Sequence, residues 1–186
     1  MIAMNILLSI GGASGSIYGI RLLEELKKAG VETHLIVSDG AKKIIEHETN
    51  YKFKDLKKLA DFYYENEDIF AGPASGSFKL EAMVICPCSM KTLSAVAKGY
   101  GDTLTSRAAS CRLKEEYKLI LVVRETPLDL PGIENMRKAK LAGATILPAM
   151  PGFYHKPKNI EDLIDFLVGK ILDQLDIKHS LFKRWK

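Results

Sequence analysis

The sequence predicts an α/β protein, a three-layer α/β/α sandwich built around a mainly parallel sheet. Short, nearly continuous apolar runs, typical of strands buried on both faces, alternate along the chain with amphipathic helical patterns. Loops of glycine and small polar residues follow several of these runs, as expected where a strand turns into a helix. The chain has 186 residues without an internal repeat or clear linker, so we expect one domain over residues 1–186.

The segment from Asn5 to Lys28 contains the first strand, loop and helix. The apolar run Asn5–Ile10 predicts the strand, and an apolar stripe within Ile17–Lys28 predicts the helix. Loop 11–16 holds only small residues, and its glycines allow positive φ and the close approach of a ligand. Because N–H groups at a helix start attract anions, we predict a binding site for phosphate or carboxylate here. The loop is neither a Walker loop nor a G-x-G-x-x-G motif, so a tight turn without a ligand is the alternative.

The second strand, Val31–Val37, precedes Ser38 and a helix over Ala41–His47. Ser38 is either a ligand contact at the carboxyl end of the strand or the N-cap of that helix. Residues 50–70 are the least regular part of the chain, and their lysines indicate a solvated helix face. Tyr63-Tyr64 is either a surface aromatic pair or part of a subunit contact.

The third strand, Ala82–Cys86, is followed by the polar residues Ser89–Thr92 and a helix over Leu93–Lys98. Hydroxyl and N–H groups at a helix start suit a phosphate or a polar ring edge. Cys86 and Cys88 lack the spacing and the second cysteine pair of a zinc site. We therefore predict buried free thiols and no metal.

A further helix is predicted over Thr103–Glu116, with Asp102 as its cap. Arg107 and Lys114 are seven residues apart, so they share one face of this helix. Two cations in this arrangement can bind a diphosphate or an acid, or they can be ordinary surface charge.

The fourth strand, Lys118–Val123, ends in Arg124-Glu125. In an open sheet of parallel strands, ligands bind at the carboxyl ends of the strands. Four strand ends then bring Gly12–Ser14, Ser38, Ser89–Thr92 and Arg124-Glu125 to one edge, in a Rossmann-like or flavodoxin-like arrangement.

The C-terminal third is predicted to hold a helix over Gly132–Leu141, a fifth strand over Ala144–Leu147 and a last helix over Ile160–Leu175. Loop 148–157 combines prolines with aromatic and basic side chains and is predicted to form a rigid binding lip. Segment 177–186 contains the only tryptophan, Trp185, and is either frayed or docked on a neighbouring subunit.

The composition excludes several classes of protein. Net charge is +4, from 27 basic and 23 acidic residues spread evenly along the chain, which argues against nucleic acid as a partner. Apolar runs stay well below the length of about 18 residues that a membrane span needs. Three cysteines, an odd number, and a start without a signal-peptide pattern predict a cytoplasmic protein.

Several loops taken together carry a resemblance that extends from about Asn5 to Trp185. They resemble, in order, the UbiX-type flavin prenyltransferases of the wider flavoprotein family, which also includes Cys-peptide decarboxylases. The matching segments are Gly12-Ala13-Ser14-Gly15, Pro73-Ala74-Ser75-Gly76-Ser77, Cys86-Pro87-Cys88-Ser89-Met90-Lys91-Thr92, Arg124-Glu125-Thr126-Pro127 and Pro151-Gly152-Phe153-Tyr154-His155.

The resemblance implies which residues form the site. It implies an FMN site made by Gly12, Ala13, Ser14, Ser38, Ser89, Met90, Lys91, Thr92 and Arg124. It implies that Tyr154 and Lys170 hold the phosphate of dimethylallyl phosphate. The implied catalytic residues are Glu125, Ser14, Arg107 and Lys114. A Glu125 that acts as a base and a Glu125 that only orients Arg124 are both open.

The implied reaction joins a dimethylallyl group to N5 and C6 of reduced FMN without a metal. Its product, prenylated FMN, is a cofactor for a decarboxylase of the UbiD type. The implied assembly is a homododecamer with sites at subunit interfaces. The sequence leaves open whether the prenyl donor is a monophosphate or a diphosphate.

Two other functions are compatible with parts of the sequence. An FMN-dependent decarboxylase of the same superfamily usually has a histidine before the third strand and a Pro-x-Met-Asn segment. Here those places read Ser77-Phe78-Lys79 and Pro148-Ala149-Met150-Pro151. A non-catalytic flavin carrier is the third possibility, and the charged pair after the fourth strand argues against it. Where some relatives carry a tryptophan, this chain reads Asp68-Ile69-Phe70-Ala71-Gly72.

Overall fold

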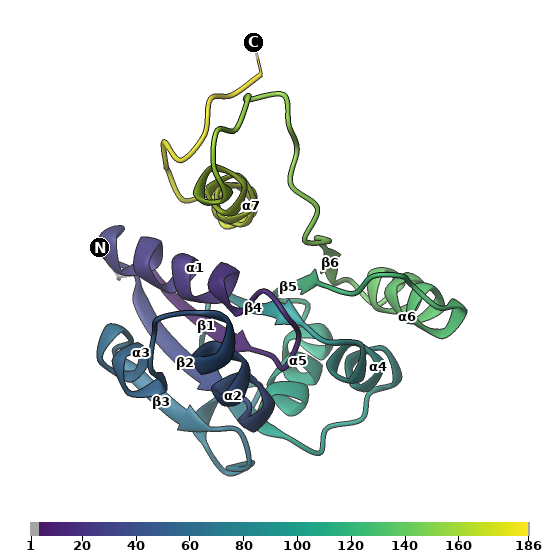
Figure 1. Cartoon of the computed structure of the whole chain (residues 1–186). Helices are drawn as coiled ribbons and strands as arrows, with labels where there is room; N and C mark the ends of the chain where they lie inside the picture. Colours follow the sequence, from purple (N-terminus) through teal and green to yellow (C-terminus); the bar gives the residue numbers. More distant parts are fainter. Residues whose placement is uncertain (1–3, 186) are drawn as a thin grey trace.

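The computed structural model describes residues 4–185 and contains one sheet of six strands in the order β3-β2-β1-β4-β5-β6 (Figure 1). Every neighbouring pair of strands is parallel. The strands are β1 Asn5–Ile10, β2 Glu32–Val37, β3 Phe62–Glu65, β4 Ala82–Cys88, β5 Lys118–Val123 and β6 Thr145–Ile146. The strand order reverses between β1 and β4, which is the point where ligands bind in such sheets. The predicted fold class is confirmed.

Helices cover both faces of the sheet. They are α1 Ser16–Lys28, α2 Asp39–Glu48, α3 Phe53–Leu59, α4 Met90–Lys98, α5 Leu104–Lys114, α6 Leu130–Leu141 and α7 Ile160–Gln174, with a short 3₁₀ turn at Gly72–Ala74. Ile6 and Leu8 of β1 face a core shared with α1 and α7, whereas Leu7 faces a second core shared with α4 and α5. Burial on both faces explains the continuous apolar runs of the central strands.

The edge strand β3 was missed by the sequence prediction. Its four residues follow the lysine-rich helix α3 after a two-residue break, and its two ends are exposed. Tyr63 packs on Phe53 of α3 at 5.4 Å between ring centroids, and the Lys57 ammonium lies 3.9 Å from the Tyr63 ring centroid. Side-chain packing rather than an apolar run therefore holds this strand, in keeping with a sheet edge.

Most predicted helix starts are confirmed by their caps. Ser38 and Asn159 accept hydrogen bonds from the N–H groups of Ala41 and Asp162. The prediction of Asp102 as the cap of α5 is wrong by one residue, because Thr103 accepts from the Ser106 N–H group. Asp102 instead accepts from the Ser106 hydroxyl at 3.2 Å.

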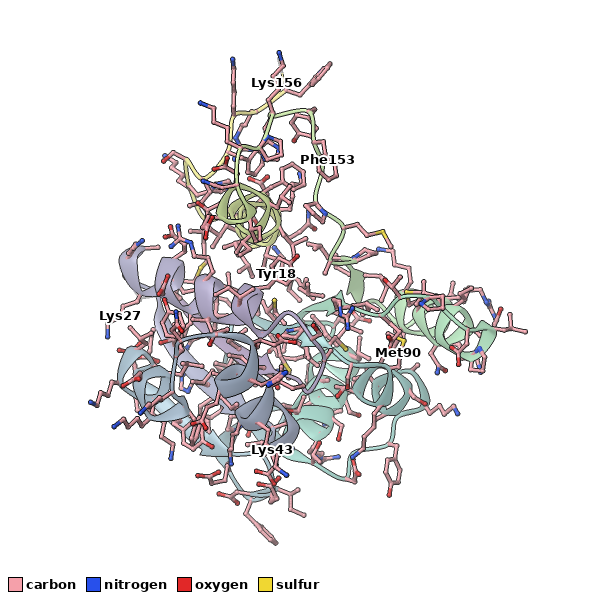
Figure 2. All side chains as sticks on the ribbon, in the orientation of Figure 1. Tyr18, Lys27, Lys43, Met90, Phe153 and Lys156 are labelled. Atoms are coloured by element: carbon pink, nitrogen blue, oxygen red, sulfur yellow. The ribbon has the colours of Figure 1, made fainter. Side chains whose placement is uncertain are left out.

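The loop after β6, helix α7 and the C-terminal tail form a projection on the outer side of α1 (Figure 1). Arg21 of α1 donates to Asp165 of α7 at 2.7 Å and fixes this contact. The tail folds back along α7, where Asp173 accepts from Arg184 at 2.6 Å and from His179 at 3.1 Å. Phe153 and Lys156 lie at the far end of the projection (Figure 2). Of the predicted docking segment 177–186, Lys186 lies outside the described residues.

Candidate functional site

A cavity of about 410 Å³ opens at the carboxyl edge of the sheet, beside the reversal in strand order. Its walls come from the segments after β1, β2, β3 and β4 and from the first turn of α5. Five residues predicted for the FMN site line it, namely Gly12, Ser38, Ser89, Lys91 and Thr92. The convergence expected from the sequence is therefore present for the ends of β1, β2 and β4.

The starts of α2 and α4 give this cavity its anion-binding character. The Ser38 hydroxyl accepts from the Ala41 N–H group at 3.2 Å, and the Ser89 hydroxyl accepts from the Thr92 N–H group at 3.3 Å. The backbone N–H groups at positions 39–40 and 90–91 have no acceptor within residues 4–185. Free N–H groups at a helix start carry partial positive charge and bind phosphate oxygens. Lys91 lies beside them, exposed at the cavity wall.

The start of α1, where the sequence predicts a binding site for an anion, is occupied by a side chain of the protein itself. The carboxylate of Glu48, at the end of α2, accepts from the N–H groups of Gly15 at 2.9 Å and Ser16 at 3.3 Å. Burial acts to raise the pKa of Glu48, but hydrogen bonds from Ser14, Gly15 and Ser16 outweigh it and lower that pKa. A side chain of the protein thus takes the carboxylate position at this helix start. Glu48 carries no local signal in the sequence, because it lies 33 residues from its partner Gly15.

Arg124 and Glu125 follow β5 but do not pair with each other. The Arg124 side chain lies near Gly15, and its buried Nε has no hydrogen-bond partner within the described part of the chain. Glu125 is exposed and accepts from the N–H group of Thr126 at 3.2 Å. The absence of a bond between them, in residues 4–185, leaves the Glu125 carboxylate free to act on a ligand.

Arg107 and Lys114 share the exposed face of α5, as predicted, but lie at opposite ends of that helix. Arg107 is near the cavity end, and its Nε donates to the carbonyl of Ala74 at 3.2 Å. Lys114, about 10 Å further along the axis, pairs with Glu115 at 3.1 Å. One chain alone does not bring Lys114 to the cavity.

Tyr154 and Lys170 belong to the projection around α7. The Tyr154 ring packs edge-on against Phe166 and Trp185, with centroids 5.4 and 5.6 Å apart. Lys170 lies 3.5 Å from the Asp173 carboxylate and lines a second, largely apolar cavity of about 300 Å³ between β6 and α7. The predicted prenyl-phosphate residues are thus together in one part of the fold, apart from the polar cavity.

Apart from the five residues of the polar cavity and Lys170, the predicted residues line neither cavity, and this includes Arg107, Arg124 and Glu125. Ala13 is buried, Ser14 is exposed, and Met90 points toward Gly132 of α6 (Figure 2). Cys86 and Cys88 are buried free thiols, and burial raises the pKa of Cys88 to about 12. Within residues 4–185 there is no group of His, Cys, Asp and Glu side chains that could hold a metal ion, nor a helix long and apolar enough to span a membrane.

Comparison with known proteins places this geometry in context. A family model described as Flavoprotein matches residues 2–172. A flavin prenyltransferase UbiX from Methanocaldococcus jannaschii is 52% identical over 182 residues, covering 98% of each chain. Another, from Thauera aromatica, is 50% identical over 182 residues, covering 98% of this chain and 94% of that protein.

Two solved structures are similar over almost the whole chain. The crystal structure of AnUbiX (PadA1) in complex with FMN and dimethylallyl pyrophosphate gives a TM-score of 0.97 at 43% identity, covering 99% of this chain and 98% of that one. A dodecameric FMN-dependent UbiX-like decarboxylase from Escherichia coli O157:H7 gives 0.96 at 41% identity, covering 98% and 100%.

The contact between Glu48 and the start of α1 predicts a pH-dependent stability. Because hydrogen bonds in the folded state lower the pKa of Glu48 below its ordinary value of 4.5, its contribution is present above that value and is lost as pH falls. In urea unfolding at about pH 7, Glu48→Gln should be less stable than the unsubstituted protein, and the difference should shrink below about pH 4.

The matched control for that experiment is Glu46→Gln. Glu46 is an exposed carboxylate on the same helix and makes no hydrogen bond or ion pair in the described structure. Its substitution should leave the unfolding midpoint unchanged at both pH values. A Glu48→Gln difference that is the same at both pH values would show that the carboxylate charge is not what stabilises α1.

Proposed function

The chain belongs to the flavoprotein family and, within it, to the UbiX flavin prenyltransferases, and on that premise we propose how its residues share the reaction. The enzyme transfers a dimethylallyl group from dimethylallyl phosphate to reduced FMN. The observation that carries this function is the polar cavity with two open helix starts, in a chain 43% identical to a protein solved with FMN and dimethylallyl pyrophosphate.

In this proposal the phosphate of FMN binds at the starts of α2 and α4. Ser38 and Ser89 orient these two helix starts, and Lys91 adds a positive charge beside them. Gly12 lets the loop after β1 approach the ligand closely, since a side chain there would extend toward Gly40. No metal is required, because N–H groups and lysine supply the positive charge.

The reaction needs two bonds to the flavin. The carbon–oxygen bond to phosphate breaks as a carbon–nitrogen bond forms at N5, with loss of the N5 proton. A proton then adds to the dimethylallyl double bond, C6 bonds to its branched carbon, and loss of the C6 proton completes the new ring. Reduced FMN supplies both nucleophilic atoms. Positive charge from Arg124, Arg107 and Lys170 stabilises the departing phosphate. Glu125 takes the C6 proton. Ser14, in the loop after β1, contributes a hydroxyl group to the reacting site.

The site is completed by a neighbouring subunit in this proposal. Lys114, Tyr154 and Lys170 lie outside the polar cavity of their own chain, so a second copy must bring equivalent residues to it. Phe153 and Trp185 are 68% and 77% exposed at the end of the projection, where a second copy can cover them. We propose that segment 177–186 docks there and that the assembly is a dodecamer, as in the E. coli protein.

Two further parts of the proposal concern the cell. The product is a modified flavin, so an enzyme that uses such a cofactor must take it up, and we propose a UbiD-type decarboxylase. We place the protein in the cytoplasm because Cys86, Cys88 and Cys111 are all free and buried.

The reaction is tested by the mass of the flavin. The protein is incubated without oxygen with reduced FMN and either dimethylallyl monophosphate or diphosphate, and the flavin is analysed by mass spectrometry. The expected result is a gain of one C5H8 unit together with released phosphate. Unmodified FMN with both donors would contradict the proposed function, and samples without donor are the control.

Substitution of Glu125 separates its two possible roles. If Glu125 removes the C6 proton, Glu125→Gln should bind FMN normally but close the ring about 10²–10⁴-fold more slowly, so that a singly bonded N5 adduct accumulates. Glu125→Asp, which keeps the carboxylate, should close the ring faster than Glu125→Gln. Ring closure at the normal rate in Glu125→Gln would mean that another group takes the proton.

The exposed aromatic residues of the projection predict the mode of assembly. Combining Phe153→Ser with Trp185→Ala should lower the mass measured by light scattering and raise the KM for the prenyl donor. The pair Phe153→Tyr and Trp185→Phe, which keeps the rings, should do neither. Both residues are exposed in one chain, so the separated subunits should stay folded and lose only the small stabilisation from the ring contact between Trp185 and Tyr154. An unchanged mass would place the interface elsewhere.

A further inference from the structure

A buried chain of hydrogen bonds forms the floor of the polar cavity. The hydroxyls of Ser9 on β1 and Thr105 on α5 are 2.7 Å apart, and the Thr105 hydroxyl donates to Oδ1 of Asn66 at 2.7 Å. All three residues are buried, with exposed fractions between 0 and 7%, and all three line the cavity. Buried polar side chains are costly unless they are hydrogen-bonded, and these three side chains bond one another.

The direction of each hydrogen bond in this chain follows from its partners. Oδ1 of Asn66 can only accept, and it receives both the backbone N–H group at 3.3 Å and the hydroxyl of Thr105. The single hydroxyl hydrogen of Thr105 is therefore used, so Ser9 must donate its own hydrogen to Thr105. This arrangement fixes the Asn66 amide, and within residues 4–185 its NH₂ group makes no hydrogen bond to the protein.

Asn66 also accepts hydrogen bonds from the backbone N–H groups at the start of α5. The backbone carbonyl of Asn66 accepts from the Leu104 N–H group at 2.7 Å, and its side-chain oxygen accepts from the Thr105 N–H group. The next N–H group, of Ser106, is bonded to the Thr103 hydroxyl. The start of α5 therefore offers no backbone donors to an anion, in contrast to the starts of α2 and α4.

The two sides of the cavity therefore differ in what they offer a ligand. Phosphate is favoured at α2 and α4, whereas the wall formed by the chain Ser9–Thr105–Asn66 offers a neutral amide donor. The acidic residues Glu67 and Asp102 also line the cavity, next in sequence to Asn66 and Thr103, and they disfavour an anion on that side. Given that FMN is the ligand, as in the proposed function, we propose that the Asn66 NH₂ group donates to a neutral oxygen of FMN. In this role Ser9 and Thr105 are positioning residues that hold the amide in the binding orientation.

The test replaces the Thr105 hydroxyl and compares two flavins. Thr105→Val keeps the shape but removes the donor to Asn66, and one such hydrogen bond corresponds to about a tenfold rise in the FMN dissociation constant. Thr105→Ser keeps the hydroxyl and should stay within about twofold of the original value. Binding is measured by quenching of flavin fluorescence.

Riboflavin, which lacks the phosphate, identifies the part of the ligand that is recognised. Thr105→Val should raise the dissociation constants of riboflavin and FMN by the same factor, whereas Lys91→Ala should raise the dissociation constant of FMN alone. Thr33→Val is the matched structural control, because the Thr33 hydroxyl is also buried but bonds Asp61 near the amino end of β2. It should lower thermal stability and leave both flavin affinities unchanged.

Each outcome decides the inference. Equal FMN affinity in Thr105→Val and the unsubstituted protein would overturn it, and so would a loss confined to FMN with riboflavin unaffected. Failure of the unsubstituted protein to bind either flavin would overturn the proposed function itself, and this inference with it.

Discussion

The N–H groups at helix starts along the carboxyl edge are the constraint on which this site depends. Each helix there begins with donors that the helix itself cannot satisfy. At α1 the carboxylate of Glu48 takes them, and at α5 Asn66 takes them with two neutral oxygens. Among the helix starts within residues 4–185, those of α2 and α4 line the cavity and keep open donors. Because its own side chains bond the N–H groups at the other two helix starts, the protein directs a phosphate to one side of the cavity.

The sheet brings these helix starts together because its strand order reverses between β1 and β4. The loop after β1 meets the carboxyl end of β4, where the Gly11 N–H group donates to the Pro87 carbonyl at 3.0 Å. A side chain at Gly11 would place its Cβ 2.5 Å from that oxygen, so the contact requires glycine. A Cβ added at Gly19 on α1 would clash in the same way with the Cys86 carbonyl oxygen, so glycine at this position lets α1 pack directly on β4.

The sequence predicted what depends on local pattern and missed what depends on distant contacts. Four central strands follow from apolar runs, and the Ser38 cap, one of two alternatives at that position, follows from residue type at the strand end. The cap at Ser89 was not predicted, because the helix was expected to begin at Leu93. Glu48 and Asn66 carry no local signal, because their partners lie 33 and 39 residues away. The separation of Lys114 from the cavity was equally invisible, since helical periodicity gives a shared face but not which end of the helix meets the ligand.

A cavity that is polar and open in one chain poses a problem for prenyl transfer. Water inside it would screen the positive charge that stabilises the departing phosphate, and excluding water strengthens that stabilisation. Within residues 4–185 no aromatic side chain lines the polar cavity, and the aromatic cluster of Tyr154, Phe166 and Trp185 lies on the projection instead. If a neighbouring copy places that cluster over the cavity, assembly supplies both the apolar cover for the dimethylallyl group and the missing cation. In that arrangement each site combines the polar cavity of one chain with the aromatic cluster of another, so the reaction depends on subunit contact.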